Sequence, residues 1–180
     1  MTLNATNSIL YRAVETGRLV ARPALNQKVE AKRFLYVTPN VYRGLAGKDP
    51  DLSHLPMAKM EELIAIFCFG WFVTASLKGD PDERGPDIER LHSVDEVWVI
   101  CARKPRHVQV RLFGRFLDAG VFIGLGLHCR HWLGIKKNYS ETVAGIPDLW
   151  GNTMGNAQPF RAATALEHVK GICRDVDEKI

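Results

Sequence analysis

Apolar residues occur along the chain in runs that predict both helices and strands. The clearest run, Leu63 to Val73, carries an apolar residue or glycine at every position. Pro56 precedes it and suits the first turn of a helix. We therefore predict one buried helix near residues 57–77. The large side chains expected in the core are Leu63, Ile64, Ile66, Phe67, Phe69, Trp71 and Phe72.

Strand-like patterns lie on both sides of this run. Residues 33–37 are aromatic and β-branched and end at a Thr-Pro-Asn turn, and residues 97–102 are continuously apolar. Residues 108–117 and 121–131 alternate between apolar and other side chains. We predict an α+β fold, with a small antiparallel sheet packed against helices. This sheet would consist of a three-stranded meander plus an N-terminal strand.

The length of 180 residues suits one domain. We predict a single α+β domain over residues 31–180, with further helices over about 139–150 and 162–174. Residues 1–30 contain a short helical stretch and then Gly17 and scattered charges, so we predict an N-terminal arm or short helix. The pattern leaves open whether this arm packs on its own chain or on a partner.

Cysteine spacing and hydropathy bear on the cellular compartment. The four cysteines lie far apart without a CxxC pair, and three lie in apolar or strand-like runs, where a reduced cysteine acts as a small hydrophobic side chain. The longest apolar run has 11 residues, against roughly 20 for a membrane-spanning helix. Residues 1–20 lack the apolar stretch of a signal peptide. We expect a cytoplasmic protein with no membrane partner and with Cys68, Cys101, Cys129 and Cys173 unpaired.

Positive charge is concentrated in one part of the sequence. The chain has 24 Lys and Arg against 20 Asp and Glu, but residues 101–137 contain eight basic residues and one acidic residue, Asp118. His107, His128 and His131 fall in the same window. Such a local concentration attracts phosphates or acidic protein surfaces. The eight basic residues are Arg103, Lys104, Arg106, Arg111, Arg115, Arg130, Lys136 and Lys137.

Strand alternation predicts that part of this charge shares one face of a hairpin. If Phe116 pairs with Val121, the apolar faces of the two strands align and the other face surrounds Gly124 and Gly126. Glycines leave room for a ligand to approach, arginines hold phosphates and aromatic rings stack on bases. The alternative is that a helix covers this face and that its arginines pair with acidic residues elsewhere. The inward residues would be Val110, Leu112, Ile123, Leu125 and Leu127. The predicted nucleic-acid-binding residues are Arg111, Phe113, Arg115, Arg130, Lys136 and Lys137.

Candidate catalytic groups occur in the same region. RNA is cleaved without a metal when its 2′-hydroxyl attacks the adjacent phosphate, provided that the protein supplies charge and proton transfer. We predict His128, His131 and Arg115 as catalytic residues, with Tyr139 and the lysines before it as further proton carriers. No cofactor is expected, since the chain has no GxxxxGK[ST], HExxH or GxSxG motif. No metal site is predicted either, because residues three apart in a strand point to opposite faces. A cysteine–histidine pair using Cys129 or Cys101 stays open in principle.

The order β, α, β, β, β, α, with basic residues on the later strands, resembles the RelE/ParE toxin superfamily over residues 33–150. The closest part runs from Arg111-Leu-Phe-Gly-Arg-Phe to Leu127-His-Cys-Arg-His-Trp-Leu-Gly-Ile-Lys-Lys-Asn-Tyr139, followed by a helix. The resemblance implies a small α+β domain that cleaves messenger RNA on the ribosome, or in the ParE branch inhibits gyrase. It also implies neutralisation by an antitoxin.

Three functional hypotheses follow from these observations. The first is a metal-independent endoribonuclease of a toxin–antitoxin system. The second is a non-enzymatic binding or inhibitor protein of a mobile element, which uses its basic face to hold RNA, another nucleic acid or an acidic protein partner. The third is a structural subunit whose basic face is an interface. The sequence leaves the oligomeric state open.

Overall fold

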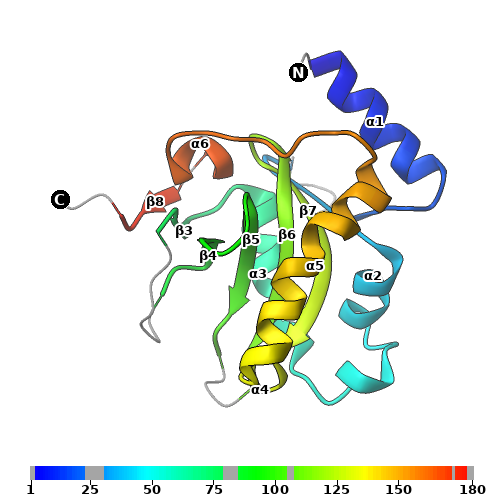
Figure 1. The fold of residues 1–180 in the computed structure, drawn as a ribbon. Coiled ribbons are helices and arrows are strands. Elements are labelled where there is room, and N and C mark those ends of the chain that lie inside the picture. Colours follow the sequence, from blue (N-terminus) through cyan, green and yellow to red (C-terminus); the bar gives the residue numbers. More distant parts are fainter. Residues whose placement is uncertain (1–2, 23–30, 79–84, 105–107, 172, 178–180) are drawn as a thin grey trace.

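The computed structural model describes residues 3–22, 31–78, 85–104, 108–171 and 173–177, and these form one mixed eight-stranded sheet with helices against it (Figure 1). The strands are β1 (Val20–Arg22), β2 (Phe34–Val37), β3 (Val73–Ser76), β4 (Ile88–Leu91), β5 (Val97–Ala102), β6 (Val110–Asp118), β7 (Val121–Cys129) and β8 (Cys173–Asp175). Their spatial order is β1-β2-β7-β6-β5-β4-β3-β8. The pairs β2–β7, β3–β4 and β3–β8 are parallel and the others are antiparallel.

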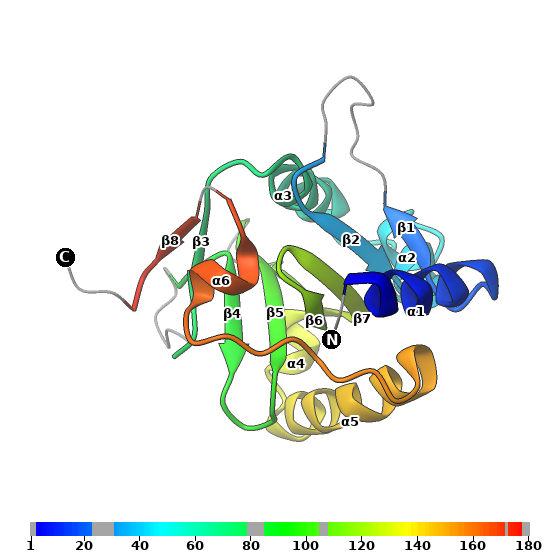
Figure 2. The same ribbon diagram turned by 90° about the horizontal axis from the view of Figure 1, so that it is seen from above.

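Helices cover both faces of this sheet (Figure 2). They are α1 (Leu3–Glu15), α2 (Pro39–Leu45), the 3-10 helix η1 (Pro50–Leu52), α3 (Met57–Phe69), α4 (Arg130–Leu133), α5 (Lys136–Met154) and α6 (Ala165–Val169). One face carries α2 and α3, whereas the opposite face carries α5. None of the described helices combines the length and the apolar character needed to cross a membrane.

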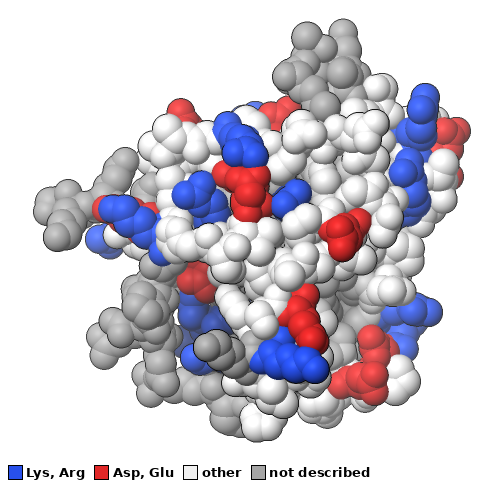
Figure 3. Space-filling view, viewed as in Figure 1, with Lys and Arg blue, Asp and Glu red and all other residues white. Residues whose placement is uncertain are grey.

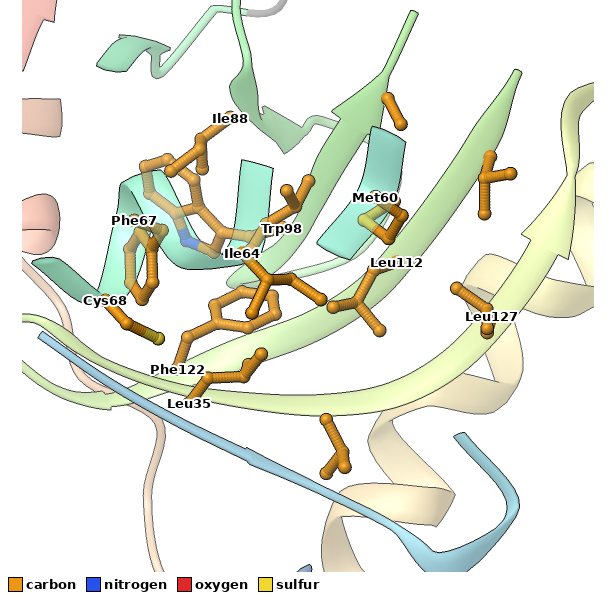
Figure 4. Close-up of a cluster of buried hydrophobic side chains, with 14 of the residues drawn as sticks. Leu35, Met60, Ile64, Phe67, Cys68, Ile88, Trp98, Leu112, Phe122 and Leu127 are labelled. Atoms are coloured by element: carbon orange, nitrogen blue, oxygen red, sulfur yellow. The ribbon is translucent and has the colours of Figure 1, made fainter. Parts of the chain in front are cut away.

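The larger core lies between α3 and the sheet (Figure 4). Phe67 of α3 is fully buried, and its ring packs edge-on against Phe122 of β7 with the centroids 6.5 Å apart. Trp98 of β5 is fully buried in the same cluster, and its ring packs edge-on against Phe116 with the centroids 5.2 Å apart. The smaller core joins α5 and the opposite side of the sheet, and Ala13 of α1 is buried in it. Within residues 1–30, the described part, residues 3–22, therefore contributes a packed helix and an edge strand.

The α+β class is confirmed, but the prediction of a small antiparallel sheet is wrong. The meander is present as β5, β6 and β7, and it lies inside a sheet that contains parallel pairs. The added strands have only three or four residues, which is too short for a recognisable period. Side chains distant in sequence hold them: the Asp87 carboxylate accepts hydrogen bonds from Thr74 N and Oγ1 at 2.9 and 2.8 Å.

The helix predicted near residues 57–77 ends at Phe69. Gly70 takes a left-handed conformation with φ of 72°, and its N–H bonds to the carbonyls of the last turn. The chain then enters β3, so Trp71 and Phe72 lie on the surface with 55 % and 56 % of their area exposed. Predicted burial is confirmed for Ile64, Phe67 and Phe69, whereas Leu63 and Ile66 are half-buried.

The C-terminal helix predicted over residues 162–174 is much shorter than expected. It comprises only α6, and the chain continues into β8 beside β3. The fully buried Arg33 joins α3 to α6, because its Nε donates to Lys170 O at 2.6 Å and its Nη1 donates to Trp71 O at 3.1 Å. This arginine therefore binds carbonyls at the ends of two helices.

Candidate functional site

The β6–β7 hairpin pairs antiparallel as predicted, but its register is different. Phe116 lies opposite Phe122 and not opposite Val121, and the register shifts between Phe113 and Gly114. Gly114 permits this irregularity, since a Cβ there would lie 2.0 Å from the backbone oxygen of Ile123. The prediction that five apolar residues of the hairpin share one inward face is wrong. Val110, Leu112 and Leu127 face the α3 side of the sheet, whereas Ile123 and Leu125 face the α5 side.

The face that carries Arg111, Phe113 and Arg115 lies beneath α5. Phe113 is fully buried, and the two arginines are only 8 % and 7 % exposed. Arg115 Nη2 donates to Asp95 O at 2.8 Å, and the guanidinium lies 5.9 Å from the ring centroid of Trp150. Burial lowers the pKa of the Arg115 side chain. A helix thus covers the strand arginines, as in the first part of the alternative stated above, but Arg115 binds a main-chain carbonyl and Arg111 binds Gln109.

The basic window does not produce a uniform positive surface. Acidic and basic side chains are interspersed on the face that carries α5 (Figure 3). Two of the basic side chains form ion pairs: Arg103 Nη2 lies 3.4 Å from Glu89 Oε1, and Lys137 Nζ lies 3.7 Å from Glu141 Oε1. Arg106 and His107 lie outside the described residues, as does the side chain of Lys136, the first residue of α5.

Arg130 is exposed at the start of α4. Its Nη1 donates to Gln109 Oε1 at 3.2 Å, and the same oxygen accepts from Arg111 Nη2 at 3.3 Å. The Arg130 N–H also donates to Gln109 O at 2.8 Å. Gln109 therefore connects a buried guanidinium to one that reaches the surface.

A pocket of about 470 Å³ opens where β7 ends, and we call it the histidine pocket. The parallel pairing of β2 with β7 explains its position, because the segments that follow both strands meet at the same end of the sheet. One wall therefore comes from the chain between α2 and α3, and the other from the end of β7 and α4. The lining residues are Asp49, Asp51, Leu52, His54, Leu127, His128, Cys129, His131 and Trp132.

His128 is the half-buried histidine of this pocket, whereas His54 and His131 are exposed. The His128 ring stacks on Trp132 with an interplanar angle of 13° and a centroid distance of 5.0 Å, and it meets Phe113 edge-on at 6.0 Å. Burial lowers the pKa of His128 below its usual value, so the imidazole is neutral at pH 7. The space beside it depends on Gly126, where a Cβ would lie 3.3 Å from His128 Nε2.

The opposite wall is built on η1. The Asp49 carboxylate accepts from Asp51 N at 3.0 Å and caps this short helix. Gly44 of α2 lets the wall approach β7 closely, since a Cβ there would lie 2.9 Å from Leu127 and 3.0 Å from Leu52. The two aspartates are thereby held at the pocket, and His54 is exposed there.

The cysteines do not form an evident catalytic or metal centre. Cys68, Cys101 and Cys129 form no disulfide, and burial raises the pKa of Cys101 to about 12, which keeps this thiol protonated at neutral pH. Cys129 is half-buried at the histidine pocket. In the part of the chain that the structure describes, no three His, Cys, Asp or Glu side chains are grouped to hold a metal ion.

The structure brings His128 and His131 to one pocket but separates them from Arg115. Arg115 lies four positions along β6 from Arg111, the residue that pairs with His128 in β7, and four positions span about 13 Å of a strand. Asp49, Asp51, His54 and Trp132 were not predicted as site residues. Asp49, Asp51 and His54 lie in a polar turn, and the pairing of β2 with β7 is what brings them to His128 and His131. Trp132 follows His131 directly in the sequence.

Comparison with protein-family models, with curated proteins and with solved structures finds no match to this chain. The site is therefore interpreted from its own chemistry. Three imidazoles and two carboxylates surround one open pocket, with an indole ring at its edge. Imidazoles and carboxylates transfer protons, and an indole offers a flat apolar surface.

Proposed function

We propose that this chain cleaves RNA by acid–base catalysis in the histidine pocket. The observation that carries the proposal is the gathering of His54, His128 and His131 around one pocket that is open to solvent. Cleavage of RNA by its own 2′-hydroxyl needs one group to accept a proton and another to donate one. The pocket supplies imidazoles in two different environments, which suits these opposite roles.

His128 suits the role of general base. Its low pKa keeps the ring neutral at pH 7, so that it can take the proton of the 2′-hydroxyl. The 2′-oxygen then attacks phosphorus, and the bond from phosphorus to the 5′-oxygen breaks. The leaving 5′-oxygen takes a proton from a second imidazole, for which the exposed His131 and His54 are the candidates. The products are a 2′,3′-cyclic phosphate and a free 5′-hydroxyl.

Arg130 is the best candidate to hold the phosphate. It follows Cys129 of the pocket directly, it is exposed, and its hydrogen bonds to Gln109 fix the approach of the guanidinium. A guanidinium so placed would stabilise the charge that develops on the phosphate oxygens. Arg115 has no part in this scheme because it is buried beneath α5. The resemblance to RelE-like toxins and the antitoxin partner stay predictions.

The proposal is tested by incubating the purified chain with a labelled RNA in the presence of EDTA. Cleavage should persist in the chelator and should fall about 100-fold or more in His128→Ala, because positioned acid–base groups contribute that much. His92→Ala is the matched control, since His92 is exposed at the end of β4 and is not part of the pocket. Full activity of folded His128→Ala would reject the proposal. Binding without cleavage would favour the non-enzymatic binding protein.

A further inference from the structure

Trp132 is a large aromatic side chain that is held in place and yet remains exposed. Trp132 is 45 % exposed as a residue, although one face of its ring stacks on His128 at an interplanar angle of 13°. Its backbone is also fixed, because Trp132 O accepts from Asn138 Nδ2 at 3.0 Å. The indole is therefore ordered before any ligand arrives, which lowers the entropy that binding would cost.

On the side of α4 and α5, apolar and cationic groups surround Trp132, whereas Asp49 and Asp51 lie on the opposite wall of the pocket. Ile135 and Tyr139 follow on the surface with 58 % and 38 % of their area exposed. Arg130 and Lys137 are exposed in the same short segment of α4 and α5. Flat apolar surface beside cations matches a ligand that alternates planar rings with phosphates, which is the chemistry of a nucleic-acid strand.

We propose that Trp132 holds an unpaired base of the substrate, so that the substrate is a single-stranded nucleic acid. This inference rests on the proposed function for the identity of the substrate. Because His128 covers one face of the indole, a base would stack on the opposite face, with the indole between the base and the His128 ring. The sugar and phosphate attached to that base would then enter the histidine pocket, which Trp132 also lines. A base inside a duplex has both faces covered by its neighbours, and a double strand cannot use this surface.

A single-stranded DNA oligonucleotide is the appropriate probe, because it carries bases and phosphates but lacks the 2′-hydroxyl needed for cleavage. Its affinity is compared with that of an abasic strand of equal length and charge. The base-bearing strand should bind about 5- to 100-fold more tightly, which is the range for stacking one base on an aromatic side chain. A duplex of the same sequence should bind no better than the abasic strand.

Three variants test whether Trp132 is responsible. Trp132→Leu should lose the preference for the base-bearing strand, and Trp132→Phe should keep most of it because an aromatic face remains. Trp71→Leu is the matched control, since Trp71 is also exposed, at 55 % against 45 % for Trp132, but follows α3 and does not line the pocket. It should bind both strands like the unaltered chain. Circular dichroism verifies that each variant is folded.

The outcomes separate this inference from the proposed function. Equal binding of base-bearing and abasic strands by the unaltered chain would overturn it without any variant. An unchanged preference in Trp132→Leu would overturn it as well, and so would capture of a protein partner by this surface with no affinity for either strand. If the preference depends on Trp132 but RNA is not cleaved, the stacking site stands and only the catalytic proposal fails.

Discussion

Replacing Phe67 by alanine tests the core that supports the sheet. The side chain is fully buried, contacts Phe122 edge-on and carries the Arg33 guanidinium 5.4 Å from its ring centroid. Truncating a buried phenylalanine costs about 3–5 kcal/mol, of which the ring pair accounts for about 0.5–1.5 kcal/mol. For a chain of this length the melting temperature should fall by about 6–20 °C.

The matched control is Phe72→Ala, five residues further along the same apolar run. Phe72 is 56 % exposed, so its truncation should change the free energy of unfolding by no more than about 0.5 kcal/mol. Urea titrations followed by far-ultraviolet circular dichroism measure both variants. Equal losses of stability would refute the boundary at Gly70 and would restore the continuous buried helix that the hydropathy pattern predicts.

Four further outcomes are expected. Gly114→Ala should lower the free energy of unfolding by about 3 kcal/mol or more, because the added Cβ meets a backbone oxygen. Gly151→Ala in α5 should raise it by about 0.5–1 kcal/mol, since the added Cβ meets nothing within 4 Å; urea titrations measure both. Burial alone would raise the pKa of Glu96, but its bonds to His168 and Trp98 hold this pKa below the usual 4.5. The stability that Glu96 contributes is therefore complete above about pH 4.5 and is lost as the pH falls through the lower folded value, and Glu96→Gln should flatten that slope in urea titrations at different pH values. Arg115→Ala should lower the melting temperature but leave the affinity of the folded chain for oligonucleotides unchanged. If RNA is cleaved, the acidic limb of kcat/KM should have its midpoint below about pH 6.5, since the base is neutral His128; a midpoint above that value would argue against this assignment.

The sequence predicted long elements better than short ones. The meander strands β5, β6 and β7 have six to nine residues, and their apolar content marks them clearly. The edge strands β1 and β8 have three residues each, and no periodic pattern can be recognised over such a length. Their pairing depends on distant contacts, such as the bond from Ser76 Oγ to Asp177 at 2.8 Å.

The predicted hairpin face failed for a different reason. Alternation assigns side chains to faces only while the register is unbroken, and one irregularity at Gly114 moves Ile123 and Leu125 to the side of α5. The sequence also predicted a helix after β7 but did not reveal which face it covers. That docking removes Arg111 and Arg115 from the surface.

Two of the residues that line the histidine pocket, His128 and His131, were predicted from the sequence. His128 and His131 follow each other closely at the end of a predicted strand, so their types and spacing could be noted without a structure. Asp49 and His54 lie about 80 residues earlier in the chain, and only the parallel pairing of β2 with β7 brings them to the same pocket. Parallel pairing across such a separation leaves no local pattern in a single sequence.

The identity of the cleavage product tests the proposed function most directly. The substrate is a DNA strand with one ribonucleotide at a defined position, so that only one 2′-hydroxyl is available. We predict a single cut immediately after that ribonucleotide, a 2′,3′-cyclic phosphate detected by mass spectrometry, and loss of the cut in His128→Ala. Cleavage of the all-DNA strand at the same rate, or a product without the cyclic phosphate at any reaction time, would contradict it.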